Sequence, residues 1–533
     1  MTKPICIVQS LNKLQKMHFT SFRICDGWNT WKLLSSIALI AVITGTGCQR
    51  NSATLIENVG QYQRVFLGDK VQLDGTSLLD WGAKKVTFNW DFDWDFSDAN
   101  IQLDSEEAAP QHVYTKPGVY FARFEVTDEH GNKDYDFTTV EVLSDTKPGV
   151  QFVYGFEAGI GITNLKQAGS NFTFTLKNTN SFHFRLDNCA NKEVIIKIYG
   201  YGPKRPCPET MTIYADDYTF DTYGSHDDYR LVYNFDYSNP QWHHLEDATY
   251  KYNSDEASLE IRCTFSQSPV YLAWSAPYLP SYLYRFWQDL EAKPNPKLKV
   301  LEIGKTVQGR SLKACIISDT IYSEKDKNTV IAFSTQHGFE SVHGWTMQGM
   351  VNYLLSNASE VANALKRTIF KVVPQVNIDG VYHGVYRYNI NGVDLNRDPG
   401  ATQPEMIALN SLEKTSDNLA FYFKFHTHPP ESPPLLEYRG YGDIDPELHK
   451  SFVKDYLQPT LGYDVIFKNR FERYRFGRGH FGVVNGYRFL IECSNLYLAP
   501  GVPSLPPNLQ QVGEGTIKSV NAYMKDKDKH AGN

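Results

Sequence analysis

The sequence predicts a multidomain protein in which two N-terminal β-sandwiches precede an α/β domain with a mixed central sheet. Strand-forming segments dominate residues 56–280, and helical periodicity is confined to the part of the chain that follows. At 533 residues the chain is too long for one typical domain. Its 41% of hydrophobic and 14% of aromatic residues are enough to build several cores.

The first 48 residues are expected to be a targeting signal. Basic residues precede the apolar run 33–43, which is too short to span a bilayer but typical of a signal-peptide core. Small residues then lead to Cys48 in a pattern that resembles a bacterial lipoprotein cleavage site, although Gly45 replaces an aliphatic residue. The protein is therefore expected to be exported, either lipid-anchored at Cys48 in the bacterial cell envelope or secreted. An uncleaved anchor and a start at Met17 are the alternatives.

Residues 56–146 are predicted to form the first sandwich. A turn signal at 74–77 follows the short segment 71–73, and residues 119–127 alternate so that apolar side chains share one face. Four phrases resemble the PKD domain, an immunoglobulin-like module common in secreted bacterial enzymes: Leu73–Thr76, Trp90–Phe92, His112–Gly118 and Val126–Gly131.

Part of the tryptophan motif is repeated within residues 90–96, which read Trp-Asp-Phe-Asp-Trp-Asp-Phe. The carboxylates of this segment predict a solvated turn, and a calcium site is the alternative.

Residues 148–280 are predicted to form the second sandwich, because 172–176, 182–186 and 194–199 have the composition of strands and no helical period interrupts them. A carbohydrate-binding-like sandwich with an exposed aromatic platform is the alternative. A tyrosine-rich segment follows, and a helix is expected to begin within 282–287.

The chemistry is predicted at the four residues from His337 to Glu340. The apolar run 330–335 reads as a strand buried on both faces, and residues 345–355 then recur at helical spacing. Open α/β sheets place their sites at such strand-to-helix junctions. An imidazole and a carboxylate three residues apart can both reach one zinc ion, and catalytic zinc commonly takes two His and one Glu. A second His is then required downstream.

Later motifs follow in a fixed order: 374–380, Tyr386-Arg387, 392–397, 425–428 and 490–492. In order and character they resemble the zinc carboxypeptidases of the carboxypeptidase A type, and most of all their cytosolic-carboxypeptidase subgroup. The resemblance covers residues 286–525, and the second sandwich is similar to the one that precedes the peptidase domain in that subgroup.

The resemblance implies that Zn2+ is held by His337, Glu340 and His426. His428 competes for the third place, because two residues apart on a strand both can face the same side; the family takes the first His of such a pair. The resemblance also implies that Glu492 is the general base and acid. Lys424 stands where the subgroup often has Asp.

The same resemblance implies a substrate site. Asn396 and Arg397 match the clamp for the substrate's C-terminal carboxylate, which a planar guanidinium recognises with a bidentate fork. Arg387 matches the arginine that stabilises the developing oxyanion. Tyr474 is a candidate for the tyrosine that closes over the substrate.

These observations predict a zinc metallocarboxypeptidase that acts on the C-terminus of a peptide or protein. A zinc amidohydrolase acting on peptidoglycan stem peptides or N-acyl amino acids, and a non-catalytic surface binding protein, are the alternatives. The 53 basic and 60 acidic residues give a net charge of −7, so nothing indicates a nucleic-acid partner. Eight cysteines are too few for a disulfide scaffold, although Cys189 and Cys207 are close enough in sequence to pair. The oligomeric state is left open.

Four arginines ahead of Glu492 line the region that forms the pocket for the terminal side chain in the family: Arg470, Arg473, Arg475 and Arg478. Positive charge there predicts a preference for acidic terminal side chains. Solvated arginines, or pairing with Glu472, are the alternative.

Overall fold

The computed structural model describes residues 62–76, 86–144, 149–159, 161–176, 182–200, 230–253, 255–398, 400–416, 418–428, 435–441, 445–469, 486–494 and 497–531. The expected targeting signal and Cys48 lie outside these residues. In the described part of the chain, no helix combines the length and the apolar character needed to cross a membrane.

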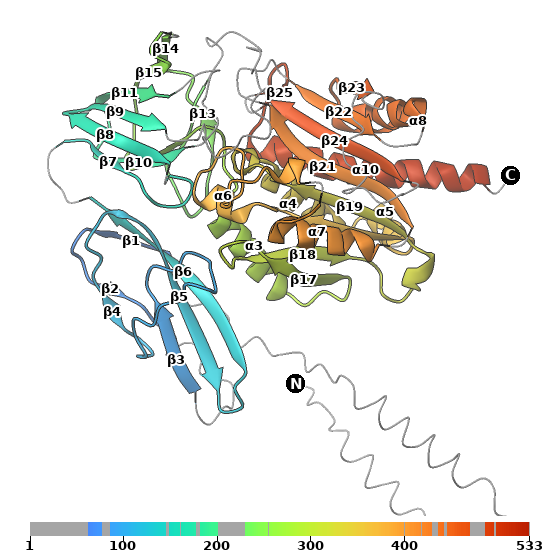
Figure 1. Cartoon of the computed structure of the whole chain (residues 1–533), viewed down its shortest axis with the longest axis horizontal. Coiled ribbons are helices and arrows are strands. Elements are labelled where there is room, and N and C mark those ends of the chain that lie inside the picture. The colour runs from blue at the N-terminus through green and yellow to red at the C-terminus, as the bar shows by residue number, and fades with distance from the viewer. Residues whose placement is uncertain are drawn as a thin grey trace, which may run out of the picture. The chain divides into compact units, whose positions relative to one another are not determined.

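An N-terminal β-rich region begins with a four-stranded sheet in the order β1-β6-β5-β3, formed by Gln63–Phe66, Lys133–Leu143, Gly118–Asp128 and Val86–Asp91 (Figure 1). The small pair β2 (Val71–Gln72) and β4 (Gln111–His112) lies beside it. Ala122, Phe124 and Val126 enter the same core from alternate positions of β5, as the sequence pattern predicts.

Two five-stranded sheets follow and share one apolar core. Strands β9 and β11 alternate exposed or half-buried residues with buried ones, which is the pattern of a strand with one face on a core. One sheet has the order β13-β12-β16-β10-β7, with bounds His243–His244, Val232–Asn234, Val270–Ala273, His183–Asp187 and Gln151–Val153. The other has the order β14-β15-β11-β9-β8, with bounds Thr249–Asn253, Ser258–Thr264, Glu193–Tyr199, Asn171–Leu176 and Ile162–Ala168.

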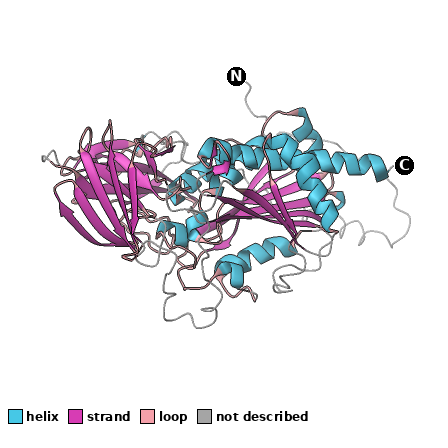
Figure 2. Ribbon diagram, turned by 90° about the horizontal axis from the view of Figure 1, so that it is seen from above, coloured by secondary structure: helices cyan, strands magenta, loops and turns pink. Residues whose placement is uncertain are grey.

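The α/β domain is built on an eight-stranded mixed sheet, and Figure 2 shows helices on both of its faces. Its four inner strands, β20, β19, β21 and β24, are parallel and mostly buried, as apolar parallel strands require. The order is β17-β18-β20-β19-β21-β24-β22-β23, with bounds Leu298–Lys305, Ser311–Ile317, Thr368–Val373, Asn328–Ser334, Leu419–His428, Tyr487–Ser494, Leu436–Tyr441 and Ile466–Asn469.

Helices connect and cover these strands. Helix α3 begins at Pro280, slightly before the predicted start, because a proline in the first turn fits a helix N-terminus. Helix α4 covers the segment expected to be helical after Glu340. The helical segments are α3 (Pro280–Glu291), η3 (Glu324–Asp326), η4 (Gly338–Glu340), α4 (His343–Leu354), α5 (Ser359–Leu365), α6 (Ile378–Tyr382), η5 (Leu395–Arg397), α7 (Pro404–Lys414), α8 (Pro446–Ser451), η6 (Phe452–Leu457), α9 (Gln458–Leu461) and α10 (Pro506–Ala531), and the short strands β25 (Tyr497–Ala499) and β26 (Val502–Pro503) precede α10.

The repeated tryptophan motif is divided between two cores. Trp90 and Phe92 belong to the core of the first sheet, whereas Trp94 and Phe96 belong to the core that includes the α/β domain. Phe96 lies 4.9 Å from Tyr284 of α3, centroid to centroid, and its carbonyl accepts a hydrogen bond from the Tyr284 hydroxyl. The second copy therefore packs against the α/β domain rather than within its own sheet.

The acidic side chains of this motif form a hydrogen-bonded turn. Asp91, Asp93 and Asp104 place carboxylate oxygens within 4.8 Å of one another. The Asp91 carboxylate accepts from the backbone N–H groups of Asp93 and Gln102, and Asp104 accepts from that of Phe92. Backbone donors thus bind the carboxylates of Asp91 and Asp104.

The cysteines that the structure describes carry free, buried thiols: Cys189, Cys263, Cys315 and Cys493. The Cys189 thiol contacts the carbonyl of Leu186. Cys207, its suggested partner, lies outside the described residues.

Candidate active site

The site lies where the central parallel strands carry their polar residues. His337 follows β19, His426 lies in β21 and Glu492 lies in β24. His426 and Glu492 are in register on neighbouring parallel strands, so their side chains emerge on the same face of the sheet. Both strands continue two residues beyond these side chains and stay paired up to His428 and Ser494.

Glycine permits the tight loop that carries the first two residues. A Cβ on Gly338 would lie 2.3 Å from the carbonyl oxygen of Val385, so a larger residue would force this backbone contact apart. Phe339 donates its N–H to the carbonyl of Tyr386, and their rings stack 4.3 Å apart. Asn377 donates its side-chain amide to the carbonyl of Gln336. These contacts fix the loop to the segment that carries Arg387.

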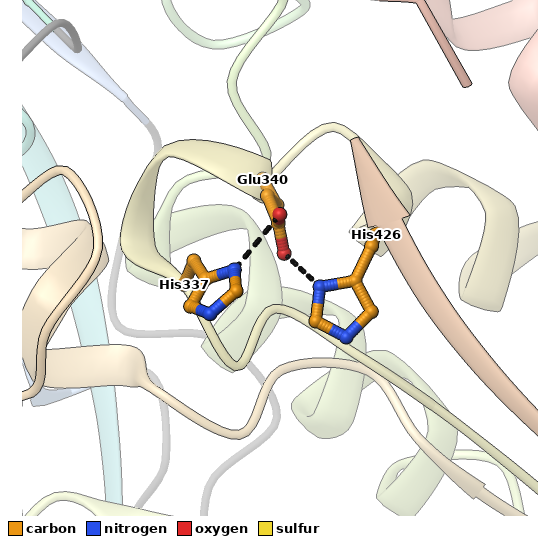
Figure 3. A group of neighbouring side chains, drawn as sticks. All are labelled: His337, Glu340 and His426. Atoms are coloured by element: carbon orange, nitrogen blue, oxygen red, sulfur yellow. Dashed lines mark hydrogen bonds and ion pairs between the residues drawn. The ribbon is translucent and has the colours of Figure 1, made fainter. Parts of the chain in front are cut away.

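His337, Glu340 and His426 converge with their side chains facing one another (Figure 3). The Glu340 carboxylate bridges the two imidazoles, with Oε1 2.9 Å from His337 Nδ1 and Oε2 2.8 Å from His426 Nδ1. Each residue offers a ligand atom within 4.8 Å of those of the other two, and all three are about 2% exposed. The structure thus brings together the three residues predicted as metal ligands.

The triad is electrostatically coupled. Burial opposes ionisation of Glu340, but the charges of His337 and His426 hold the pKa of its carboxyl well below the ordinary value. Burial likewise opposes protonation of His337, and Glu340 and Asp394 on its two sides outweigh it and raise its pKa. The pKa of His426 is lowered, mainly by burial. A buried, ionised carboxylate between two imidazoles is the donor set that zinc prefers.

Asp394 contacts the triad through His337 and is not itself one of the three predicted ligands. Its Oδ1 lies 3.1 Å from His337 Nε2, and its Oδ2 accepts a hydrogen bond of 2.7 Å from Arg387 Nε. A carboxylate on the second nitrogen of a histidine orients metal-binding imidazoles. Asp394 therefore links His337 to Arg387.

His343 contacts the backbone of His426. Its Nε2 lies 2.7 Å from the carbonyl oxygen of His426 and 3.3 Å from the thiol of Cys493. Burial lowers the pKa of His343 to about 4, so a neutral imidazole occupies this position at neutral pH. It is a buried core residue.

Glu492 faces the same side as His426 and is held by an arginine that the sequence reasoning missed. Arg439 Nη1 donates a hydrogen bond of 3.0 Å to Glu492 Oε1, and Arg439 Nε donates to the buried carboxylate of Glu437. Lys468 also pairs with Glu437. The signal available in the sequence was the charged pair Glu437 and Arg439 within an otherwise apolar or aromatic strand, which nothing local connects with Glu492.

Asn396 and Arg397 lie in η5, directly after Asp394. The Asp394 carboxylate accepts the backbone N–H of Asn396 at 2.8 Å, and Arg397 Nη1 donates to the Asn396 carbonyl at 3.2 Å. The Asn396 amide oxygen accepts a hydrogen bond from Lys424 Nζ. Burial and the nearby Arg397 charge lower the pKa of Lys424 to about 7.

Several predicted residues lie outside the described part of the chain. They are Tyr474 and the four arginines Arg470, Arg473, Arg475 and Arg478. The side chain of His428 is likewise not described. Of the two candidates for the third metal ligand, His426 is therefore the one that the structure describes, and it faces Glu340.

The residues present fit a zinc ion. His337 Nδ1 and His426 Nδ1 both face the ionised Glu340 carboxylate, at 2.9 and 2.8 Å, and His426 Nε2 is buried without a hydrogen-bond partner among the described residues. Two imidazoles and one ionised carboxylate match the three protein ligands that are typical of catalytic zinc. Asp394 is not one of these ligands but orients His337.

Comparisons with known proteins agree with this geometry. Residues 283–428 match the family model described as zinc carboxypeptidase, and residues 51–142 match the PKD domain model. Two parts of the chain thus resemble known modules, a zinc carboxypeptidase domain and a PKD domain.

Relatives of this domain are cytosolic carboxypeptidases. Cytosolic carboxypeptidase 1 of Homo sapiens is 30% identical over 147 residues, which cover 26% of this chain and 12% of that protein. Cytosolic carboxypeptidase 2 of Danio rerio is 35% identical over 136 residues, covering 24% and 18%. Cytosolic carboxypeptidase 6 of Mus musculus is 26% identical over 211 residues, covering 36% and 39%. The chain thus spans less than half the length of these relatives.

Solved structures share the fold over a larger part of the chain. The metallo-carboxypeptidase from Burkholderia cenocepacia has a TM-score of 0.57 at 17% identity, covering 71% of this chain and 99% of that one. The metallo-carboxypeptidase from Pseudomonas aeruginosa, in complex with (2-guanidinoethylmercapto)succinic acid, has a TM-score of 0.56 at 18% identity, covering 70% and 99%. These similarities cover about 70% of the chain, which is more than the predicted peptidase domain, residues 286–525.

Proposed function

We propose that this protein is a zinc-dependent metallocarboxypeptidase that hydrolyses the C-terminal peptide bond of a peptide or protein. The observation that carries the proposal is the buried triad of His337, Glu340 and His426, with Glu492 in register beside His426. The match of residues 283–428 to the zinc carboxypeptidase family supports it.

The zinc ion would be held by His337, Glu340 and His426, and when bound it would polarise the scissile carbonyl and lower the pKa of a water molecule. Glu492 accepts the proton of the attacking water at its carboxylate and returns it to the leaving amine. Its place beside His426 on the same face of the sheet suits this role. Arg439 holds one oxygen of Glu492, which leaves the other for the proton.

The substrate would be held by the residues of η5 and its neighbours. Asn396 and Arg397 bind the terminal carboxylate, and Arg387 stabilises the oxyanion that forms at the scissile carbonyl. Arg387 is anchored by Asp394, which also orients His337, so the oxyanion donor and the metal ligand share one support. Tyr474 is retained as the candidate residue that covers the substrate.

The flanking regions complete the proposal. We take the first β-rich region as a sandwich of the PKD type, and the two sheets with a common core as the sandwich that precedes the peptidase domain. The run 33–43 and Cys48 support export, with the protein lipid-anchored in the cell envelope or secreted. Acidic terminal side chains are the proposed preference, from the positive charge of Arg470, Arg473, Arg475 and Arg478.

A peptide assay tests the function. Zinc-loaded protein is incubated with a pool of peptides that differ in their last residue, and with the same peptides as C-terminal amides. Release of single C-terminal residues from the acids, with little from the amides, is expected. Release only from N-acyl amino acids or peptidoglycan stem peptides would assign an amidohydrolase instead, and binding without any release would assign a binding protein.

The preference is tested within the same pool. Peptides ending in Glu should be cleaved faster than those ending in Lys or Phe, and neutralising Arg475 or Arg478 should reduce that advantage by about tenfold, the loss of one charged hydrogen bond. Faster removal of Lys or Phe by the wild type would contradict it.

A further inference from the structure

A buried lysine lies between the metal ligands and the predicted carboxylate clamp. Lys424 precedes His426 by two residues on β21, so both side chains emerge on the same face of the sheet. The Lys424 side chain is buried, and its Nζ donates a hydrogen bond to the amide oxygen of Asn396. Burying an ammonium group is costly unless it is hydrogen-bonded, and the bond to Asn396 meets this need.

Asn396 is fixed at its backbone and accessible at its tip. Asp394 caps η5 and accepts the Asn396 N–H, and the same Asp394 oxygen contacts His337, so the Asn396 backbone has a defined place relative to the triad. The side chain is half-buried, and its amide nitrogen has no hydrogen-bond partner among the described residues. Two donor hydrogens are therefore left for a ligand.

The direction of that amide decides what it can bind. The oxygen and the NH2 group of an asparagine have nearly the same shape, so the surrounding hydrogen bonds determine which atom faces which side. In its protonated form the Lys424 amine has three donors and no acceptor, so it can bond only to the oxygen. The NH2 group must then point away from Lys424, and a carboxylate needs a donor there.

We propose that Lys424 is a positioning residue that turns the Asn396 amide so that its NH2 group, and not its oxygen, faces the C-terminal carboxylate of the substrate. The inference rests on the proposed function and deepens it, because it adds a residue to the recognition of the free C-terminus. Arg397, held beside Asn396 through the Asn396 carbonyl, supplies the cationic part of the same clamp.

The proposal explains why the residue at 424 matters for this chain in particular. An aspartate, which the resembling subgroup often has there, could only accept a hydrogen bond. It would draw the Asn396 NH2 group towards itself and present the oxygen to the substrate. Lys424→Asp should therefore impair recognition of a carboxylate more than Lys424→Met, which leaves the amide free to turn.

Binding can be measured without turnover. A peptide acid and the same peptide as its C-terminal amide are titrated calorimetrically into zinc-loaded Glu492→Gln protein, with and without Lys424→Met. We expect Lys424→Met to weaken binding of the acid by about tenfold, the effect of one charge-assisted hydrogen bond, and to leave binding of the amide within about twofold. In the active protein, KM for the acid should rise by a similar factor while kcat changes less.

Lys371 provides the matched control. It is as buried as Lys424, at 8% exposure for each residue, and it donates to Ser416 and to the carbonyl of Thr415 instead of to the site. Lys371→Met should lower stability without changing the ratio of acid to amide affinity. A loss of acid affinity as large as that of Lys424→Met would show that removing any buried lysine has this effect, and would overturn the proposal.

A double-mutant cycle tests the route through Asn396. Lys424→Met should cost nothing further once Asn396→Ala is present, whereas two losses that add would overturn the proposal. Asn396→Asp keeps a partner for Lys424 but removes the NH2 group, so it should stay folded and lose acid affinity even if Lys424→Met does not fold. Acid affinity equal to the wild type in Asn396→Asp would contradict the proposal.

The two claims can fail separately. A wild-type protein that binds peptide acids over amides but releases no residue would sink the proposed function and keep the role of Lys424. A protein that cleaves peptide acids, with Lys424→Met unchanged in KM and in acid affinity, would sink the role of Lys424 and keep the function.

Discussion

Two buried ionic clusters in the α/β domain differ in how completely their polar atoms are paired. Around Arg310, the guanidinium donates to Asp95, Gln308 and Asp379, and the Asp379 carboxylate also accepts from the Thr306 hydroxyl and the Gln308 N–H. In the triad, His426 Nε2 is left without a partner among the described residues.

The difference separates a structural cluster from a ligand site. Buried charges are tolerated when donors and acceptors match, and such a cluster fixes the position of the segments that it joins. Here Arg310 joins the loop after β17 to α6 and to the second copy of the tryptophan motif, through Asp95. The triad instead leaves one imidazole nitrogen, His426 Nε2, unmatched among the described residues and places His426 Nδ1 against an ionised carboxylate, which is a donor set for a cation.

The largest expected effect comes from replacing the proposed general base, Glu492, while the triad and the Arg310 cluster are left unchanged. Glu492→Gln should lower turnover by about 10²- to 10⁴-fold, because the amide cannot accept a proton from water. Zinc content and peptide binding should stay unchanged. The control is Glu157→Gln, a buried carboxylate that is bonded to Ser281 and Tyr237. Wild-type rates in Glu492→Gln would assign the base elsewhere.

The structural cluster should respond in the opposite way. Arg310→Met leaves the buried carboxylate of Asp379 without its cation and should lower the free energy of unfolding by about 3 to 5 kcal/mol, with zinc stoichiometry retained. Chemical denaturation followed by circular dichroism measures it. The matched control crosses the same interface at the surface, where Lys305 pairs with Asp98, both about 40% exposed. Asp98→Asn should cost at most about 1 kcal/mol. Loss of zinc from Arg310→Met would erase the distinction between the clusters.

A third buried carboxylate, Glu157, has no cation bonded to it in the described part of the chain, and the pH dependence of stability tests what burial does to such a group. Burial raises the pKa of Glu157 to about 7, although the Ser281 N–H and the hydroxyls of Ser281 and Tyr237 all bond to it. The folded protein then binds the proton more tightly than the unfolded chain. Stability contributed by the protonated group is full below the unfolded pKa and is lost as pH rises towards 7.

Wild-type stability should therefore fall between about pH 4.5 and 7 by up to about 3 kcal/mol more than that of Glu157→Gln. Denaturation midpoints of both proteins over this range measure the difference. Parallel pH profiles for the two proteins would mean that Glu157 keeps its ordinary pKa in the fold.

The smallest expected effect concerns the support of the triad. Asp394→Asn can no longer hold His337 Nε2 as a charged acceptor, and zinc affinity should fall by about 10- to 100-fold, the usual effect of such an outer partner. Competition with a fluorescent chelator measures the affinity. An unchanged zinc affinity would show that Asp394 serves Arg387 alone.

The sequence predicted those parts of the molecule that have a local pattern. The apolar run before His337 and the helical period after Glu340 identify a strand-to-helix junction, and the structure has β19 and α4 there. Alternation along 119–127 likewise predicted that Ala122, Phe124 and Val126 share one core, although the other face of β5 is buried as well. These patterns are visible because hydrophobic periodicity follows secondary structure directly.

Other contacts had no local pattern to reveal them. Asp95 and Arg310 are 215 residues apart in sequence, and Arg439 and Glu492 are 53 apart. Their pairing depends on how sheets and loops pack, which periodicity does not encode. The repeated Trp-Asp-Phe motif was recognised, but its division between two cores follows from the docking of α3 against Phe96.

Zinc stoichiometry tests the central claim most directly. The wild type, refolded or dialysed with zinc and then freed of excess metal, is analysed by plasma mass spectrometry beside the double variant His337→Ala/His426→Ala, with His383→Ala as a histidine control outside the triad. The account predicts one zinc per chain in the wild type and in His383→Ala, and none in the double variant. Equimolar zinc retained by the double variant would contradict it.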